Sequence, residues 1–225
     1  MARSARIVVP GLPYHVTHRG NNRQATFLTE EDFECYLFHL REHAREYGAQ
    51  MLSYCLMSNH VHHVMIPLHK EALAQVMGFT HARYTQSFNK RHRQCGHLWQ
   101  GRFYSSALDA SHLIRALCYV ERNPVRAGIA SRADAYRWSS AAAHITGTDT
   151  TNIVDMSWWH EHIDSECWPA MLMHLEDITW VEQIRQTTLH DRPLGDEGFI
   201  HHIEEQSGCK FPSTRVGRPS RTRYR

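Results

Sequence analysis

The chain has 225 residues, of which 42% are hydrophobic and 21% charged, and it contains six Trp. This composition excludes general disorder, and a chain of this length buries a core without disulfide or metal staples. No apolar run approaches the roughly 18–20 residues that cross a bilayer, and the apolar stretch near the N-terminus is too short for a secretory signal. We therefore expect a cytoplasmic globular protein with no membrane partner.

Charge is distributed unevenly along the chain. Residues 1–148 carry 17 Lys and Arg against 10 acidic residues, whereas residues 149–205 carry 2 against 13. The residues after Glu205 include six basic ones and no acidic one. This asymmetry predicts a polyanion-binding domain over residues 1–148, an acidic helical region over 149–208 and a basic, flexible tail over 209–225.

The first predicted element is a strand at Tyr14–Arg19, where side chains alternate until Gly20-Asn21-Asn22 breaks the pattern. A helix follows, with Thr29 as its N-cap, acidic residues in its first turn and Gly48 at its end. Two strands, a helix, a strand and a helix come next, at residues 51–57, 61–67, 71–89, 101–108 and 111–122. The order β-α-β-β-α-β-α predicts an α+β fold, a ferredoxin-like palm with an antiparallel sheet and packed helices.

Beyond residue 148 the periodicity is weaker. Short helices are predicted at residues 168–176, 180–188 and 196–207, the last closed by Gly208, and residues 191–195 have the composition of a linker. We expect a mainly helical C-terminal extension.

The stretch from residue 72 to residue 108 contains no Asp or Glu, although five Lys and Arg alternate there with aromatic residues. Cations meet phosphates and aromatic faces stack on unpaired bases, so this pattern is typical of a surface for single-stranded nucleic acid. A solvated helix face beside ordinary core aromatics is the alternative. The complete absence of acidic residues over this stretch favours nucleic acid.

A histidine pair, His60-Val61-His62, lies at the start of a predicted strand. Residues i and i+2 of a strand point to the same side, so both imidazoles can reach one ion while Val61 enters the core. Imidazole is the commonest metal ligand in proteins. The chain contains 19 His, however, so such a pair also arises by chance and a structural role stays open.

Tyr119 lies on the predicted helix 111–122, and Asn123 follows one helical turn later. Pro124 disfavours the helical conformation of Asn123 and places it near the helix end. By itself, Tyr119 has the pattern of a packed aromatic residue on an amphipathic helix.

Four sequence blocks resemble those of one family and follow one another along the chain in the order that the family has. Met57-Ser58-Asn59-His60-Val61-His62 is similar to the histidine–hydrophobic–histidine (HUH) signature of single-tyrosine transposases, and residues 119–128 are similar to their nucleophile helix. Residues 14–23 and 96–104 are similar to the other two blocks. From about residue 5 to residue 145 the chain resembles the REP-associated tyrosine transposases, bacterial members of this superfamily linked to repetitive extragenic palindromes.

The resemblance implies a metal-dependent endonuclease and strand transferase that acts on single-stranded DNA beside hairpins. Tyr119 would attack the scissile phosphate and form a 5′-phosphotyrosine intermediate, and His60, His62 and Asn123 would hold Mg²⁺ or Mn²⁺. The implied partner is DNA with a REP-like hairpin, bound by a monomer or a homodimer in the bacterial cytoplasm, at the nucleoid when DNA is bound.

Candidate DNA-binding residues are seven cations and one aromatic residue: Arg19, Arg23, Arg83, Lys90, Arg91, Arg93, Trp99 and Arg102. In the basic tail, Arg215, Arg218 and Arg221 are weaker candidates, because a solubilising tail has the same composition.

Two other functions fit parts of the pattern. One is a non-catalytic protein that binds DNA hairpins on the same palm. The other is an RNA-binding domain that presents aromatics on a ferredoxin-like sheet, although no RNP-type block is present. Retention of both His60 and His62 together with Tyr119 and Asn123 favours the enzyme, because binding alone does not need them together.

Overall fold

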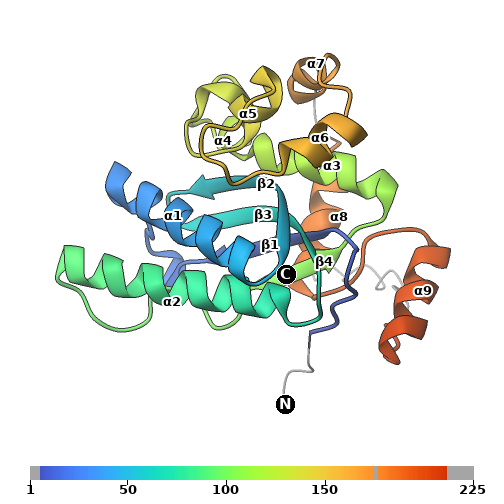
Figure 1. The fold of residues 1–225 in the computed structure, drawn as a ribbon, viewed down its shortest axis with the longest axis horizontal. Coiled ribbons are helices and arrows are strands. Elements are labelled where there is room, and N and C mark those ends of the chain that lie inside the picture. The colour runs from blue at the N-terminus through green and yellow to red at the C-terminus, as the bar shows by residue number, and fades with distance from the viewer. Residues whose placement is uncertain (1–5, 175–176, 212–225) are drawn as a thin grey trace, which may run out of the picture.

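The computed structural model of the chain describes residues 6–174 and 177–211, so the tail candidates Arg215, Arg218 and Arg221 lie outside the described residues. The described part contains a four-stranded antiparallel sheet in the order β2-β3-β1-β4 (Figure 1). The strands are β1 (Tyr14–Arg19), β2 (Ala49–Met57), β3 (His60–Pro67) and β4 (Tyr104–Ala107). This is the order of a ferredoxin-like split βαβ arrangement, so the predicted α+β fold is confirmed.

Helices cover both faces of the sheet. On one face, α1 (Glu30–Glu46) packs against α2 (Ala72–His92), and α3 (Ala110–Glu121) lies on the opposite face against β2 and β3. As predicted, Thr29 caps α1, in a capping box completed by the side chain of Asp32.

Strand alternation divides the interior into two hydrophobic clusters. Val16 and Val61 point into the cluster beneath α1 and α2, whereas Leu52 and Val64 pack with Leu117 of α3. The face with α3 is the one that concerns function, because β1 and β3 also send polar side chains to it. In the β1–β3 register, Thr17 lies opposite His62 and Arg19 lies opposite His60.

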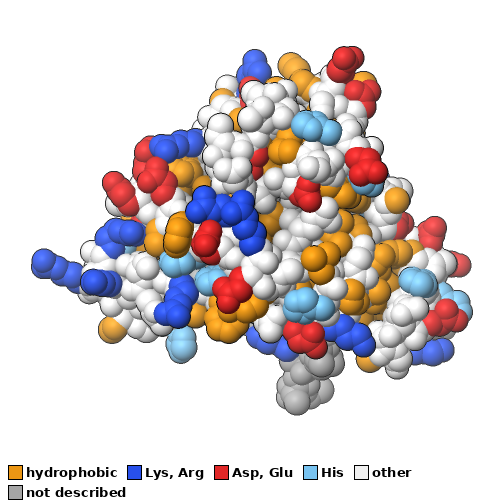
Figure 2. Space-filling view, in the orientation of Figure 1, with side chains coloured by type: hydrophobic (Ala, Val, Ile, Leu, Met, Phe, Trp, Pro, Cys, Tyr) orange, Lys and Arg blue, Asp and Glu red, His pale blue; other side chains and the backbone are white. Residues whose placement is uncertain are grey.

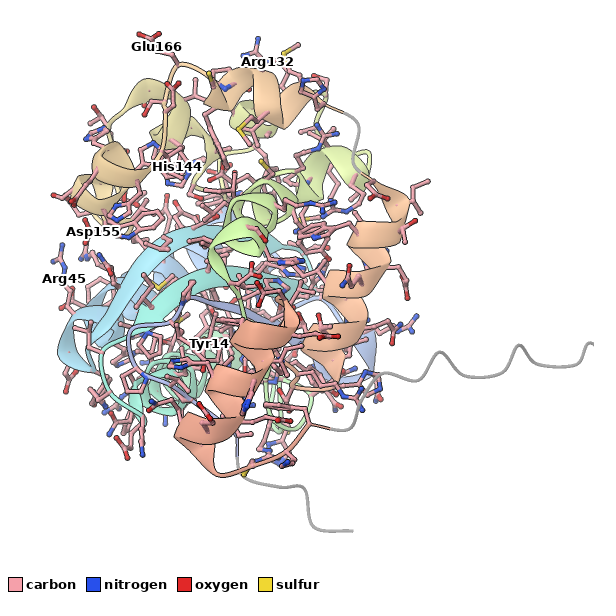
Figure 3. The ribbon with its side chains drawn as sticks, turned by 90° about the vertical axis from the view of Figure 1, so that its right-hand side faces the viewer. Tyr14, Arg45, Arg132, His144, Asp155 and Glu166 are labelled. Atoms are coloured by element: carbon pink, nitrogen blue, oxygen red, sulfur yellow. The ribbon has the colours of Figure 1, made fainter. Side chains whose placement is uncertain are left out.

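The described residues after α3 include short helices that lie over α3 and along the β4 edge of the sheet (Figures 1 and 3). They are α4 (Asn123–Arg126), α5 (Ala141–Thr146), α6 (Met156–His162), α7 (Trp168–Met173), α8 (Ile178–Leu189) and α9 (Glu197–Ser207).

Helix α8 contacts β4 and β1, and the residues after it return to the sheet. There the backbone N–H of Leu194 donates to the carbonyl of Ala107 at 2.7 Å. The division of the chain at residue 148 stays a prediction. Within residues 6–174 and 177–211, no helix is both long and apolar enough to span a bilayer.

Several predicted elements differ in extent from those observed. The strand expected at residues 101–108 is shorter in the structure, where it is β4. Gly101 has a positive φ of 28°, and pairing with β1 begins only at Tyr104. Asn123 does not end the third helix but begins α4, where Pro124 is tolerated in the first turn. Helix α7 ends at Met173, short of the expected 176, and residues 175–176 are not described.

Candidate active site

A cavity of about 450 Å³ lies between the sheet and the helices α3, α4 and α8. Among its lining residues are four that the sequence singled out as catalytic or metal-binding: Tyr119, His60, His62 and Asn123. Arg19, a candidate for DNA binding, lines the same cavity. The structure therefore brings together residues from one strand pair and one helix end that are far apart in the chain.

His60 and His62 point to the same side of β3, with ring centroids 5.0 Å apart. Burial lowers the pKa of His60 to about 4, with help from the positive charges of Arg19, Arg126 and Arg185. Burial also holds the pKa of His62 well below its usual value, and the neighbouring imidazoles add to the shift. Both rings are therefore neutral near pH 7, which is the form that binds a metal ion.

Hydrogen bonds use the Nδ1 atom of both rings. His60 donates from Nδ1 to the side-chain oxygen of Asn59 at 2.6 Å, and the Asn59 amide nitrogen donates to the carbonyl of Arg23 at 3.2 Å. In His62, Nδ1 lies 2.9 Å from Nε2 of His15. Of the two nitrogens in each ring, Nε2 is therefore the candidate ligand atom.

Tyr119 is held by aromatic and cationic neighbours at the cavity wall. Its ring meets the rings of His15 and His62 edge to face, with centroids 5.6 Å apart in both pairs. The guanidinium of Arg126 lies over the ring, 4.2 Å from its centroid. Arg185 of α8 donates from Nε to the Tyr119 hydroxyl at 3.4 Å. Two cations thus lie beside the candidate nucleophile.

The side-chain amide nitrogen of Asn123 is bound to backbone carbonyls. Nδ2 donates to the carbonyls of Tyr119 and Val120, at 3.2 and 3.1 Å. These bonds fix the side chain at the junction of α3 and α4 and leave Oδ1 as its acceptor atom. An amide oxygen can ligate a divalent cation, whereas the amide nitrogen cannot.

Sequence reasoning did not single out the other polar residues that line this cavity, which are His15, Thr17, Arg126, Glu182, Arg185, Gln186 and Thr188. The alternation of β1 could have indicated His15, because the side chains of residues 15, 17 and 19 share one strand face. Arg126 lies within the block that resembles the nucleophile helix. No local pattern places α8 over the cavity, so the residues that this helix contributes could not be found in this way.

The other DNA-binding candidates lie outside this cavity. Arg83, Lys90, Arg91 and Arg93 are exposed on α2 or just after it, and Figure 2 shows Lys and Arg side chains gathered at that end of α2, on the left. Arg91 contacts the buried carboxylate of Asp32. Arg23 is exposed in the turn after β1.

Trp99 and Arg102 line a second cavity, of about 590 Å³, beside α2. The Trp99 ring is only 8% exposed and stacks on the imidazoles of His18 and His81. Its faces are therefore packed within the protein, and the structure shows no open stacking platform at this residue.

The described residues contain no group of three or more His, Cys, Asp and Glu side chains that could hold a metal ion. The candidate site instead combines two imidazoles with an amide oxygen. Such a set suits a divalent cation that completes its coordination with substrate phosphate oxygens and water. The neutral rings of His60 and His62 and the orientation of Asn123 fit this requirement.

The family described as "Transposase IS200 like" matches residues 8–123, which is more than half of the chain. The chain belongs to this family. The match includes β1 to β4 and α3 and ends at Asn123, so the strand and the helix that carry the predicted metal ligands and nucleophile lie inside it. The resemblance to single-tyrosine transposases inferred from the sequence is confirmed. No curated protein matches the chain.

Two solved structures are similar to this IS200-like transposase. "Structure of the REP associates tyrosine transposase bound to a REP hairpin" is 16% identical, with a TM-score of 0.55, over 69% of this chain and 92% of that one. A putative transposase from Deinococcus radiodurans is 20% identical, with a TM-score of 0.39, over 54% of this chain and 97% of that one. The first likeness shows a shared fold.

Proposed function

We propose that this transposase nicks single-stranded DNA beside a hairpin and transfers the strand through a 5′-phosphotyrosine intermediate, with the help of a divalent metal ion. One observation carries the proposal: the Tyr119 side chain lines the same cavity as the two imidazoles of the HUH signature. Membership of a transposase family supports the same class of reaction.

The covalent step exchanges one phosphodiester bond for another. The Tyr119 oxygen forms a bond to the scissile phosphorus, and the bond to the 3′ oxygen of the preceding nucleotide breaks. The phenol loses its proton, and the leaving oxygen gains one to become a 3′-hydroxyl. Attack by another 3′-hydroxyl on the phosphotyrosine reverses the step and joins a new strand, with no external energy source.

Arg126 and Arg185 supply fixed positive charge for this step. Phenols are weak nucleophiles at neutral pH, because their proton leaves only near pH 10. A guanidinium beside the hydroxyl oxygen stabilises the negative charge that develops there and on the phosphate. The contacts of Arg185 with the hydroxyl and of Arg126 with the ring support this role.

His60, His62 and Asn123 would hold Mg²⁺ or Mn²⁺, which offsets charge on a non-bridging phosphate oxygen when bound. The protein prepares this site before any ion arrives, since both rings are neutral and the Asn123 amide is oriented by backbone carbonyls. The exposed cations along α2 would contact the DNA backbone outside the cavity.

The test is a covalent adduct between the protein and DNA. Labelled single-stranded hairpins from the neighbourhood of the gene are mixed with the protein in Mg²⁺, Mn²⁺ or EDTA, and adducts that survive SDS are measured. We expect a metal-dependent adduct that disappears in Tyr119→Phe while hairpin binding is kept. Tyr47→Phe is the matched control, because Tyr47 stacks on Phe79 on the opposite face of the sheet.

A fully active Tyr119→Phe variant would overturn the assignment of the nucleophile. Hairpin binding without an adduct in any metal would instead support a non-catalytic hairpin-binding protein. Equal affinity for an RNA hairpin of the same sequence would favour the RNA-binding alternative.

A further inference from the structure

A chain of buried hydrogen bonds runs from helix α8 to the HUH signature. Oγ1 of Thr188 lies 2.9 Å from Nδ1 of His15, and Nε2 of His15 lies 2.9 Å from Nδ1 of His62. The three residues belong to α8, β1 and β3, and all three are buried. The planes of the two rings differ by only 8° and their centroids are 5.2 Å apart, so the rings lie edge to edge in nearly one plane, as a hydrogen bond between their nitrogens requires.

The two histidines of the signature are held in different ways. The oxygen of Asn59 accepts hydrogen bonds but cannot donate them, so the proton of neutral His60 must be on Nδ1. His62 has no such fixed acceptor, because its neighbour is another imidazole. The position of its proton therefore depends on how the bonds beyond His15 are arranged.

The donors and acceptors along this series of hydrogen bonds can be arranged in two directions, because a threonine hydroxyl both donates and accepts. In one direction, His62 donates from Nδ1 to His15, and His15 donates from its own Nδ1 to Thr188. Nε2 of His62 is then a lone pair that can bind a cation. In the other direction, the Thr188 hydroxyl donates to Nδ1 of His15, and Nε2 of His15 donates to Nδ1 of His62. Nε2 of His62 then carries a hydrogen, so the ring cannot bind an ion at that nitrogen.

We propose that His15 and Thr188 are positioning residues that hold His62 in the tautomer required for metal binding. This inference rests on the proposed function, since it gives His62 the role of a metal ligand. The Thr188 hydroxyl is the acceptor that makes the productive direction possible. The C-terminal extension therefore completes the metal site, although none of its residues has to touch the ion.

Removal of the Thr188 hydroxyl should change the tautomer of His62. In Thr188→Val, Nδ1–H of His15 would point at a methyl group, and a buried N–H without an acceptor is penalised. His15 then favours the opposite tautomer and donates from Nε2 to His62. As a result, His62 carries its proton on Nε2 and loses the nitrogen that binds the ion.

Two further groups surround His15 outside this chain of hydrogen bonds. The Tyr119 ring meets His15 edge to face, and Arg126 contributes positive charge that disfavours protonation of the imidazole. Burial and this charge lower the pKa of His15 to about 3, so the ring is neutral at the pH of the experiment.

The experiment measures Mn²⁺ binding by the full-length protein, from the electron paramagnetic resonance signal of free Mn²⁺. Perturbing the partner of a metal-bound histidine typically weakens metal binding by about 10- to 100-fold, and we expect this loss in Thr188→Val and in His15→Phe. Thr188→Ser keeps the hydroxyl and should restore binding. Thr187→Val is the matched control, because the Thr187 hydroxyl bonds to carbonyls within α8 and not to the site.

A second readout needs no variant. The ¹⁵N shifts of the His62 imidazole in the Mg²⁺-loaded wild type should show the hydrogen on Nδ1. A hydrogen on Nε2 would overturn the inference, as would wild-type Mn²⁺ affinity in both Thr188→Val and His15→Phe. Failure of the wild type to bind any Mn²⁺ would instead overturn the metal site of the proposed function, and the inference with it.

Discussion

Nε of Arg185 donates a hydrogen bond to the hydroxyl of Tyr119 at 3.4 Å, across 66 residues of sequence. Tyr119 belongs to the part of the chain that matches the IS200-like family, whereas Arg185 lies in α8, beyond it. The contact therefore joins the candidate nucleophile to a helix that the family match does not include. It also gives the extension a direct part in the proposed reaction.

Arg185→Ala should slow formation of the phosphotyrosine adduct by about 100-fold, in the range seen when one oriented donor is removed from a transition state. Binding of the hairpin should change much less, because only one cation among many is removed. Single-turnover cleavage and hairpin titration measure the two effects. Gln183→Ala is the control on the same helix, since this exposed side chain does not line the cavity; equal rates in both variants would contradict the role given to Arg185.

A buried carboxylate fastens the nucleophile helix to the C-terminal extension. Glu121 accepts hydrogen bonds from Ser140 and from Nε1 of Trp168, at 2.5 and 2.9 Å, and His144 lies against the same carboxylate among the short helices in Figure 3. Glu121→Gln replaces one accepting oxygen by an NH₂ group. We expect it to lower the free energy of unfolding by about 1–3 kcal/mol, measured by urea denaturation.

The control for this change is Glu34→Gln, an exposed carboxylate that pairs with Arg137 at 2.8 Å. Exposed ion pairs contribute little to stability, so this variant should unfold near the wild-type midpoint. If the two substitutions lowered the free energy of unfolding equally, a larger contribution from the buried Glu121 carboxylate would be contradicted.

The stability of the protein should fall as the pH drops below about 6.5. His81 is buried against His18, Tyr36 and Trp99, and burial holds its pKa well below the usual value. The unfolded chain takes up a proton at this position near pH 6.5, while the folded chain stays neutral, so protonation favours unfolding.

This residue alone should make the folded state about 1.4 kcal/mol less stable at pH 5.5 than at pH 7.5. His81→Phe keeps an aromatic ring in the stack but cannot take up the proton, so its loss of stability over this range should be smaller by that amount. Urea unfolding at the two pH values checks the difference; parallel curves for both proteins would contradict a neutral His81.

The cations at the C-terminal end of α2 should set the salt dependence of DNA binding. Each cation that no longer neutralises a phosphate lowers the slope of log K against log salt by roughly 0.7 on single strands and 0.9 on duplex DNA. Lys90→Ala combined with Arg93→Ala should therefore flatten the slope without changing which hairpin is preferred. Arg132→Ala is the control, since Arg132 pairs with Asp134 at the top of the molecule, away from α2 (Figures 1 and 3); an equal effect there would exclude a DNA surface confined to α2.

Much of the fold could be predicted from sequence because its signals are local. Alternation at Tyr14–Arg19 and the acidic first turn after Thr29 predicted β1 and α1, and the structure confirms both. The same-side placement of His60 and His62 follows from strand geometry alone. Predicted ends were less accurate where a turn conformation decided them, as at Gly101 before β4 and at Asn123, which begins α4.

Local sequence patterns were enough to predict the order of the strands and helices, the HUH pair on one strand face and the candidate nucleophile on a helix. Each depends on neighbours within a few residues, whose spacing sets the direction of a side chain. The contact of Arg185 with Tyr119 and the hydrogen bond between Thr188 and His15, which lies 173 residues earlier, depend instead on how the helices pack in three dimensions. Such contacts form because α8 buries its apolar side, including Ile184, against the sheet and α3, and no local periodicity encodes which surface covers a helix.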